Sequence, residues 1–402
     1  MKFLLLSIGL FISVLLNATT FTSVMDGNWS NPYTWGETTV IPLTGDQVII
    51  NHTVTITDQI TSNGYWATDG ADASITIEAN GILQSGANVL GIAILNGASI
   101  VNNGQLNIPQ LGNYNGSFTN NNISHLSQLI YNLDQIENNG DLLELDSLYT
   151  SGTFINNNGA NIYTDSLWVE GSFTNIGNIY LHEITNNGTF ENIGVMNFRR
   201  FTNLADYYNS GSIIGELDAT NAGNLYLNSE SSFTLGHDFT NADSTDHNAT
   251  IIIEGTFDIS DSFYNADTIT GTDGHINIQN NSSNSGWLKG TFYFCDLSPL
   301  PLTAPFVDYN SGTVEAGIRY CTSENIAMKQ NKQINFFPNP VKSNLTIENA
   351  NKITLTDITG KIVLKQSISQ KSSINISHLK KGIYFISLEN KQKSIVRKIV
   401  IE

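Results

Sequence analysis

The chain has 402 residues, enough for more than one domain, and its formal net charge is −18 at pH 7. Residues 331–402 carry a net charge of +8, so residues 1–330 carry −26. An acidic body repels nucleic acid and anionic lipid, which argues against both as ligands, and the change of sign along the chain indicates separate modules.

The first predicted element is a secretory signal peptide over residues 1–19. Lys2 gives a basic start, residues 3–16 form an apolar run, and small and polar residues follow. The run is too short to span a membrane comfortably, and we expect cleavage near residues 18–20. A buried N-terminal helix is the alternative. Since no later stretch is apolar enough to cross a bilayer, we predict an exported protein without a transmembrane span.

Residues 20–66 are predicted to form an N-terminal cap. Trp29 and Trp35 bracket a proline turn, Pro42 begins a second turn, and residues 48–50 and 54–56 have the composition of strands. The arrangement W-x5-W…P-x-x-G-D-x-V-I-I resembles the opening segment of bacterial cell-surface β-helix proteins. A solenoid needs a cap over its first coil, which is the role that we assign to this segment. A sugar-stacking platform formed by the tryptophans is the alternative.

An internal repeat dominates the predicted body, residues 67–294. Similar segments recur at intervals of 17–19 residues, beginning at Gly140, Gly159, Gly177, Gly194 and Gly211. Short alternating runs end at Gly, Asn and Asp, and the segments lack a sustained helical period. A repeating unit of this size with short strands is typical of one coil of a parallel β-helix, or β-solenoid. A set of β-sandwich domains is the alternative.

The word Gly-Thr/Ser-Phe-x-Asn recurs inside the first three of these units. Stacked coils place like residues above like residues, so the phenylalanines are predicted to stack in the core. The asparagines are predicted to form a hydrogen-bonded ladder, either inside or at a turn. The residues concerned are Phe154, Phe173 and Phe190, and Asn156, Asn175 and Asn192. The word continues more loosely at residues 238–241 and 262–265.

Cys295 and Cys321 are the only two cysteines of the chain. An even number in an exported protein predicts a disulfide, with two free thiols as the alternative. The bridge would close a final coil over residues 295–322, and a linker is predicted at residues 323–333.

The basic tail, residues 334–402, consists of short strands joined by tight turns, which predicts a small β-sandwich of immunoglobulin-like type. It contains a Pro-Asn-Pro opening, a D-x-x-G-K-x-V hairpin, an L-x-x-G-x-Y strand and a final K-x-V strand. The residues in these words are Phe337, Pro338, Asn339, Pro340, Asp357, Gly360, Lys361, Leu379, Gly382, Tyr384, Lys398 and Val400. A sandwich that binds a ligand through its basic surface is the alternative to the interpretation that follows.

These words, in this order, resemble the C-terminal sorting domain of proteins exported by the type IX secretion system, over residues 335–402. The resemblance implies that the tail is recognised by the outer-membrane export machinery. It also implies that a sortase-like protease removes the tail, after which the body is released or attached to surface lipopolysaccharide. The expected location is therefore outside the outer membrane, either at the cell surface or in the medium.

β-Helix folds also host polysaccharide lyases and glycoside hydrolases, so an enzyme is one class of function that the body could have. Arg199-Arg200 is the one basic pair of the body, and we interpret it as solvated or ion-paired rather than as a lyase base. The repeats contain many single carboxylates but no Asp-Asp pair that would suggest a glycosidase. We therefore predict no catalytic residue, although an enzyme remains the alternative.

We predict that the protein binds neither a metal ion nor a cofactor. His237 and His247, with acids between them, are interpreted as a hydrophilic loop, with a metal site as the alternative. Structural calcium is a second alternative, at residues 69–72 or 243–246, where aspartates offer oxygen ligands.

The sequence thus predicts an all-β, exported solenoid that acts as a non-catalytic adhesin or as a surface protein that contacts carbohydrate. A polysaccharide-degrading enzyme and a structural stalk without a ligand are the alternatives.

Overall fold

The computed structural model describes residues 18–57, 64–242, 249–298, 306–321, 335–337, 341–348, 350–357, 361–368, 371–389 and 394–401. The predicted linker and nearly all of the predicted signal peptide lie outside this set. The chain divides into two compact units, Met1–Tyr320 and Cys321–Glu402, which are described separately.

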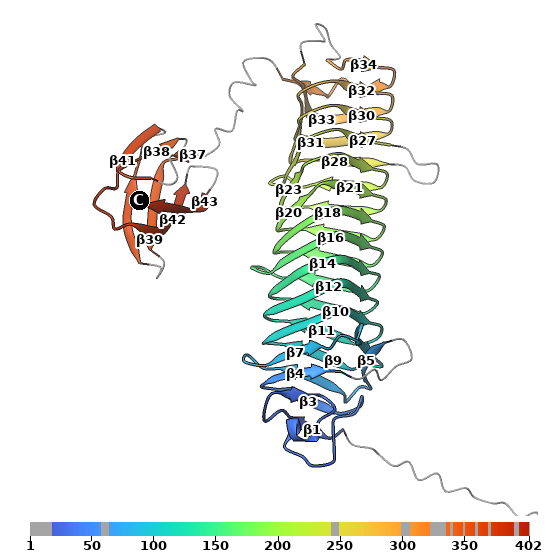
Figure 1. The fold of residues 1–402 in the computed structure, drawn as a ribbon. Coiled ribbons are helices and arrows are strands. Elements are labelled where there is room, and N and C mark those ends of the chain that lie inside the picture. The colour runs from blue at the N-terminus through green and yellow to red at the C-terminus, as the bar shows by residue number, and fades with distance from the viewer. Residues whose placement is uncertain are drawn as a thin grey trace, which may run out of the picture. The chain divides into compact units, whose positions relative to one another are not determined.

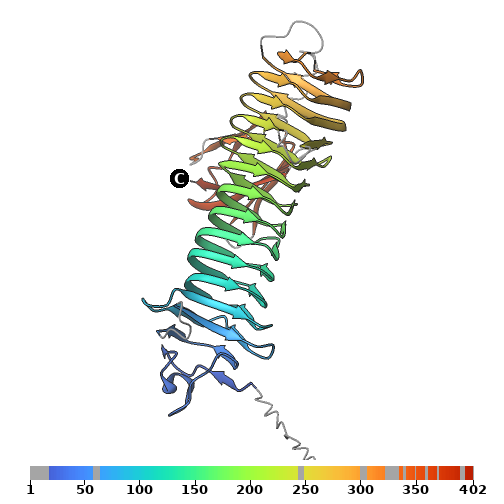
Figure 2. The same cartoon turned by 90° about the vertical axis from the view of Figure 1, so that its right-hand side faces the viewer.

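The first unit is a β-solenoid of about 11 turns (Figure 1). Its strands pair in parallel with the equivalent strands of the coils before and after, and three columns of strands result. Figure 2 shows the coils stacked along one axis. Because a β-sandwich would pair its strands antiparallel, the sandwich alternative for the body is wrong and the predicted solenoid is confirmed.

The first column contains β1 (Thr20–Thr22), β3 (Gln47–Ile50), β6 (Ser74–Ile77), β9 (Ser99–Asn102), β11 (Ser117–Asn120), β13 (Gln135–Asn138), β15 (Thr153–Asn156), β17 (Ser172–Asn175), β19 (Thr189–Asn192), β22 (Asp206–Asn209), β25 (Asn224–Leu227), β28 (Thr250–Ile253) and β35 (Thr313–Val314). The second contains β2 (Gly27–Asn28), β4 (Thr53–Ile56), β7 (Ile82–Ser85), β20 (Val195–Phe198), β23 (Ser212–Gly215), β26 (Ser232–Leu235), β29 (Thr256–Ile259) and β36 (Arg319–Tyr320). The third contains β5 (Tyr65–Asp69), β8 (Gly91–Leu95), β21 (Arg200–Asn203), β24 (Ala219–Asn221), β27 (Phe239–Asn241), β30 (Phe263–Asn265), β32 (Ser282–Asn284) and β34 (Tyr309–Asn310).

Longer strands run through two columns. Those that pass from the second to the third are β10 (Gln105–Asn113), β12 (Ile123–Asn132), β14 (Asp141–Thr150), β16 (Asn161–Val169) and β18 (Asn178–Asn186). Those that pass from the first to the second are β31 (Thr268–Ile278) and β33 (Trp287–Asp296). A short 3-10 helix, η1, spans Pro32–Trp35.

The core lies inside the coils, where alternate residues of each strand are buried. The phenylalanines of the repeated word form part of it. The rings of Phe154 and Phe173 stack at 4.8 Å with 4° between their planes, and Phe190 continues the stack at 4.8 Å and 11°. A coil buries this surface only against its neighbours, so stability depends on stacking.

The asparagines of the same word are fully buried at the corner that follows the first column. The side-chain nitrogen of Asn156 donates to the side-chain oxygen of Asn175 at 2.8 Å, and Asn175 donates in the same way to Asn192 at 2.7 Å. This first ladder runs from Asn102 to Asn209. It therefore lies inside the solenoid and satisfies buried amides that would otherwise be costly.

A second asparagine ladder occupies the corner that follows the third column. Its longest uninterrupted part runs from Asn186 through Asn241 to Asn310. The loose continuation of the word at residues 238–241 and 262–265 belongs to this second ladder. In the first column, Leu227 follows Asn209, so the first ladder ends there.

The glycine before the repeated word allows adjacent coils to approach closely. A Cβ at Gly171 would lie 2.2 Å from the carbonyl oxygen of Gly152. The predicted start of a repeat at Gly159 is wrong by one residue. Asp141 pairs with Asn161, and the amide of Asn161 donates to the oxygen of Gly140, so Ala160 is the residue equivalent to Gly140. Gly159 is an added turn residue with φ of 86°.

The N-terminal segment packs its tryptophans inward. Trp29 and Trp35 are 3% and 4% exposed, and their ring nitrogens donate to the backbone oxygens of Pro42 and Trp29. The Trp29 ring also contacts Trp66, with ring centroids 4.4 Å apart. Because the ring faces are covered, the sugar-platform interpretation of this pair is wrong.

Cys295 and Cys321 are both disulfide-bonded, which confirms the predicted bridge. The parallel register explains their proximity. Phe294 of β33 pairs with Tyr320 of β36, and each cysteine is the next residue along its chain segment.

The second unit contains two antiparallel sheets. The first has the order β37 (Asn335–Phe337), β38 (Asn344–Glu348), β41 (Lys371–Asn375), and the second has the order β40 (Ile362–Ser367), β39 (Lys352–Asp357), β42 (Gly382–Glu389), β43 (Ser394–Ile401). Residues of both sheets share one apolar core, including Leu345, Ile353 and Ile386. The immunoglobulin-like connectivity stays a prediction.

Candidate functional site

Two of the three corners of the solenoid hold asparagine ladders, and the third has a different chemistry. This third corner lies between the second and third columns and carries ionisable side chains on successive coils. We call it the charged corner, and define it by Asp146, Asp165, His182, Arg199, Glu216, Asp218, His237, Asp238 and Asp261.

A groove of about 640 Å³ follows this corner over the coils of β14, β16, β18, β20 and β23. One row of its lining comes from residues in register on successive coils, in the order Tyr163, Tyr180, Asn197, Ile214. A second row is Asp146, Asp165, His182, Arg199 and Glu216, and Glu144 lies at one end. Glu144 has φ of 62°, a conformation that few residues other than glycine adopt, at an irregularity in the register of β14.

The two basic side chains of the groove are paired. His182 Nδ1 lies 3.1 Å from an oxygen of Asp165, and Arg199 Nε lies 3.5 Å from an oxygen of Glu216. Arg200, the next residue along the chain, does not line the groove and donates to Glu183 at 3.2 Å. These pairs are exposed and contribute roughly 0–1 kcal/mol each to stability. The two arginines therefore have carboxylate partners, which agrees with the ion-paired interpretation of Arg199-Arg200.

The rings of Tyr163 and Tyr180 stack at 4.9 Å with 9° between their planes. The stack covers the facing sides of the rings, but the two tyrosines are 41% and 38% exposed, so the pair is accessible to a ligand. Burial, with the neighbouring Tyr180 and Asp141, raises the pKa of Tyr163 above its ordinary value. The phenol is therefore neutral at physiological pH and can donate a hydrogen bond.

Farther along the same corner, His237 lies among three carboxylates. Its pKa is raised, first by the hydrogen bond to Asp218 and also by the charges of Asp218, Asp238 and Asp261. His247, which the metal-site alternative groups with His237, and the candidate calcium ligands at residues 243–246 lie outside the described residues. Among the described residues, two groups bring three potential metal ligands together, and neither contains Asp69 or Asp72.

Sequence reasoning did not find the groove, although a signal was present. The triplet Asn-Ile-Tyr occurs at residues 161–163 and 178–180, at equivalent places in two adjacent repeats. Its tyrosines are the stacked pair. The carboxylates that accompany them were noted only as single acids, because their convergence depends on the lengths of the coils.

The words of the tail lie at turns and at core contacts of the second unit. The backbone amides of Asp357 and Lys361 close a hairpin, since Asp357 donates to the Lys361 oxygen at 3.0 Å and Lys361 donates to the Asp357 carboxylate at 3.1 Å. The buried Tyr384 donates its hydroxyl to the oxygen of Lys380 at 2.8 Å. The amide of Val341 donates to the oxygen of Val400 at 2.8 Å, which ties the start of the unit to its last strand.

The remaining sorting-motif residues divide by location. Leu379 packs against the core, Gly382 begins β42, and Lys398 lies on β43, while Phe337 ends β37. Pro338, Asn339, Pro340 and Gly360 lie outside the described residues. Within the described part of the chain, no helix is long and apolar enough to cross a membrane.

Residues 335–402 match the family of the secretion system C-terminal sorting domain. No curated protein matches the chain. The match covers the residues that the sequence words singled out, and it indicates export by type IX secretion to the cell surface or the medium. The chain is therefore a type IX secreted protein in which a β-solenoid body precedes a C-terminal sorting domain.

Proposed function

We propose that the exported solenoid is a non-catalytic surface protein that contacts neutral polysaccharide through the groove of the charged corner. The observation that supports this proposal is the row of polar side chains that runs along the groove over successive coils. A polymer that lies along the solenoid axis meets one such set per coil, and many weak contacts add up to useful avidity.

The charge of the groove favours a neutral polymer over a uronic acid. Its lining includes four carboxylates, from Glu144, Asp146, Asp165 and Glu216, and one arginine, which is itself paired with Glu216. Carboxylates and phenol hydroxyls bind sugar hydroxyl groups by hydrogen bonds, whereas a polyanion would be repelled.

The non-catalytic character is supported by the pairing of the basic groups. A lyase mechanism requires a free base next to the substrate, and Arg199, Arg200 and His182 each lie beside a carboxylate. The enzyme and the stalk without a ligand remain the two competing functions, and the binding experiment separates them.

The experiment is affinity electrophoresis of the purified chain through gels that contain neutral or uronic-acid polysaccharides. We expect retardation by a neutral polymer, and a loss of affinity of roughly tenfold or more in the double variant Tyr163→Ala/Tyr180→Ala, because two hydroxyl contacts are removed. Tyr208→Ala/Tyr226→Ala is the matched control, since it removes another stacked tyrosine pair, at 4.4 Å, that does not line the groove.

Equal weakening by both double variants would contradict the assignment of the groove. The absence of retardation by every polymer would favour the stalk. Shortened polymer products that disappear in Arg199→Gln or Arg200→Gln would establish the enzyme and overturn the non-catalytic proposal.

A further inference from the structure

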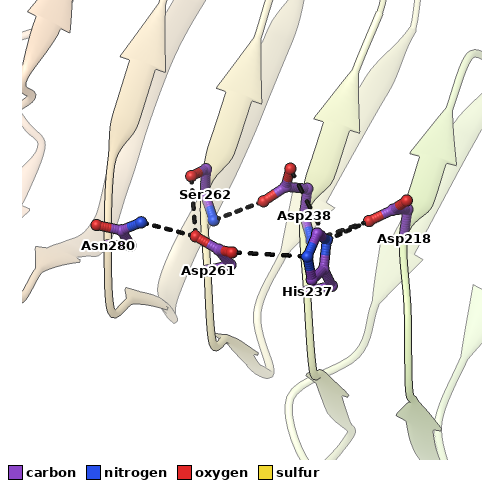
Figure 3. Close-up of polar contacts among 6 residues, drawn as sticks. All are labelled: Asp218, His237, Asp238, Asp261, Ser262 and Asn280. Carbon is purple, nitrogen blue, oxygen red and sulfur yellow. Dashed lines mark hydrogen bonds and ion pairs between the residues drawn. The ribbon is translucent and has the colours of Figure 1, made fainter.

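The part of the charged corner around His237 joins four ionisable side chains from three successive coils (Figure 3). Asp218 precedes β24, His237 and Asp238 precede β27, and Asp261 lies two residues before β30. His237 Nδ1 lies 2.6 Å from an oxygen of Asp218 and 3.9 Å from an oxygen of Asp238. The opposite ring nitrogen, Nε2, lies 3.7 Å from an oxygen of Asp261.

The two ring nitrogens therefore face different partners. One ligand atom each from Asp218, His237 and Asp238 lies within 4.8 Å of the others, which is close enough for a single ion to contact all three. Asp261 is on the other side of the ring, where a carboxylate commonly accepts the second N–H of a metal-bound histidine and fixes its orientation.

The carboxylates are held by neighbouring coils. The backbone amide of Ser262 donates to one oxygen of Asp238 at 3.0 Å, whereas the other oxygen of that carboxylate faces the ring. Asn280 donates to Asp261 at 2.7 Å, as Figure 3 shows. Because these bonds connect successive coils, the ligand set is supported by regular structure.

Other histidines of the solenoid provide an internal comparison. His125 and His182 each lie within ion-pair distance of one carboxylate, Glu144 and Asp165 respectively. The second group of potential ligands, His275 with Cys295 and Cys321, has its sulfurs in the disulfide and offers no thiolate. Among the histidines that the structure describes, His237 is thus distinguished by two carboxylates on its Nδ1 side and a third on its Nε2 side.

We propose that Asp218, His237 and Asp238 bind a divalent first-row transition-metal ion of the Zn²⁺ type. The ligands are Nδ1 of His237 and one oxygen from each aspartate, and the Asp261 carboxylate, 3.7 Å from Nε2, stabilises the N–H on that side and orients the ring. An imidazole combined with carboxylates suits Zn²⁺, whereas Ca²⁺ prefers oxygen ligands alone.

Binding replaces the proton on Nδ1, which is released to solvent, while the proton on Nε2 remains. His237 and Asp218 are half-exposed, so an ion in the medium has direct access. Three protein ligands leave at least one coordination position for water or for an oxygen atom of a partner molecule.

The test is isothermal titration of the chelator-stripped full chain with ZnCl₂ alone. We expect one site, which His237→Gln abolishes and Asp261→Asn weakens by about tenfold or more without removing it, as expected for a residue that orients a ligand. X-ray absorption at the zinc edge should show one imidazole nitrogen at about 2.0–2.1 Å together with oxygen ligands.

His125→Gln is the matched control, because it removes an imidazole that has a single carboxylate partner. Circular dichroism verifies that each variant is folded, and all substituted side chains are partly or largely exposed. Unchanged zinc binding in His237→Gln overturns the proposal. So does an equal affinity for Ca²⁺ that does not depend on His237, or an absorption spectrum without imidazole.

Discussion

In the solenoid each strand pairs in parallel with its equivalent in the next coil, whereas the sorting domain pairs its strands antiparallel. The solenoid buries amide ladders beside its phenylalanines, and the core of the sorting domain consists of apolar side chains and Tyr384. In-register coils give each amide within a ladder an identical partner on both sides, so polar residues are tolerated inside. A two-sheet unit has no such repetition and buries mainly apolar groups.

The difference also concerns cooperativity. A coil depends on its immediate neighbours, so damage to the solenoid should remain close to the altered coil. The sorting domain has one small core shared by both sheets, so damage there should affect the whole unit.

The largest effect should come from Phe173→Ala, which opens a cavity between Phe154 and Phe190. We expect a loss of about 3–5 kcal/mol in local stability. Hydrogen exchange read by mass spectrometry should show faster exchange in the coils of β15, β17 and β19, and unchanged exchange in distant coils. Uniformly faster exchange over the whole solenoid would contradict the view that damage to the solenoid stays local.

Ile386→Ala in the fully buried core of the sorting domain should cost about 2–5 kcal/mol. Because this is a large share of the stability of a small unit, amide protection should fall in all strands from β38 to β43. Export to the cell surface or medium, measured by fractionation of producing cells, should fall as well. An effect restricted to β42 would show that the sorting domain behaves locally, like the solenoid.

Asn175→Leu replaces a ladder member by an apolar side chain with the same branching at Cγ. Asn156 loses an acceptor and Asn192 loses a donor, so we expect a cost of about 2–4 kcal/mol. Asn139→Leu is the matched control. Asn139 also hydrogen-bonds an asparagine on each side, Asn121 and Asn157. Because Asn139 is exposed, water can replace these two hydrogen bonds. Comparable losses on urea titration would contradict the view that burial makes the ladder important.

The smallest effect should come from Arg200→Gln, which breaks the exposed pair with Glu183. We expect a loss of stability of less than about 1 kcal/mol, and a smaller one at high salt. Lys352→Gln breaks the corresponding pair with Glu389 in the sorting domain, whose side chains are about 40% exposed, and should behave alike. A loss above this range in one unit alone would mark a real electrostatic difference between them.

The repeated word was visible in the sequence because Phe154, Phe173 and Phe190 occur at nearly constant intervals in units of nearly constant length. The interval is disturbed at Gly159, where one added turn residue shifts the equivalent position to Ala160. The second ladder was not separated from the first, because Asn241 and Asn265 were interpreted as a looser continuation of the same word, although they end strands of another column. The tail was readable because its words mark turns, and turn residues have specific backbone requirements.

Side-chain alternation, the glycine and asparagine words and the tail motifs thus determined the solenoid, its ladder-forming residues and the sorting domain, because these features depend on neighbours in sequence or on a constant period. Only the tertiary structure decided which ionisable residues meet at the charged corner. Asp218, His237 and Asp261 converge because the turns before β24, β27 and β30 lie on adjacent coils, and the length of each coil sets that alignment.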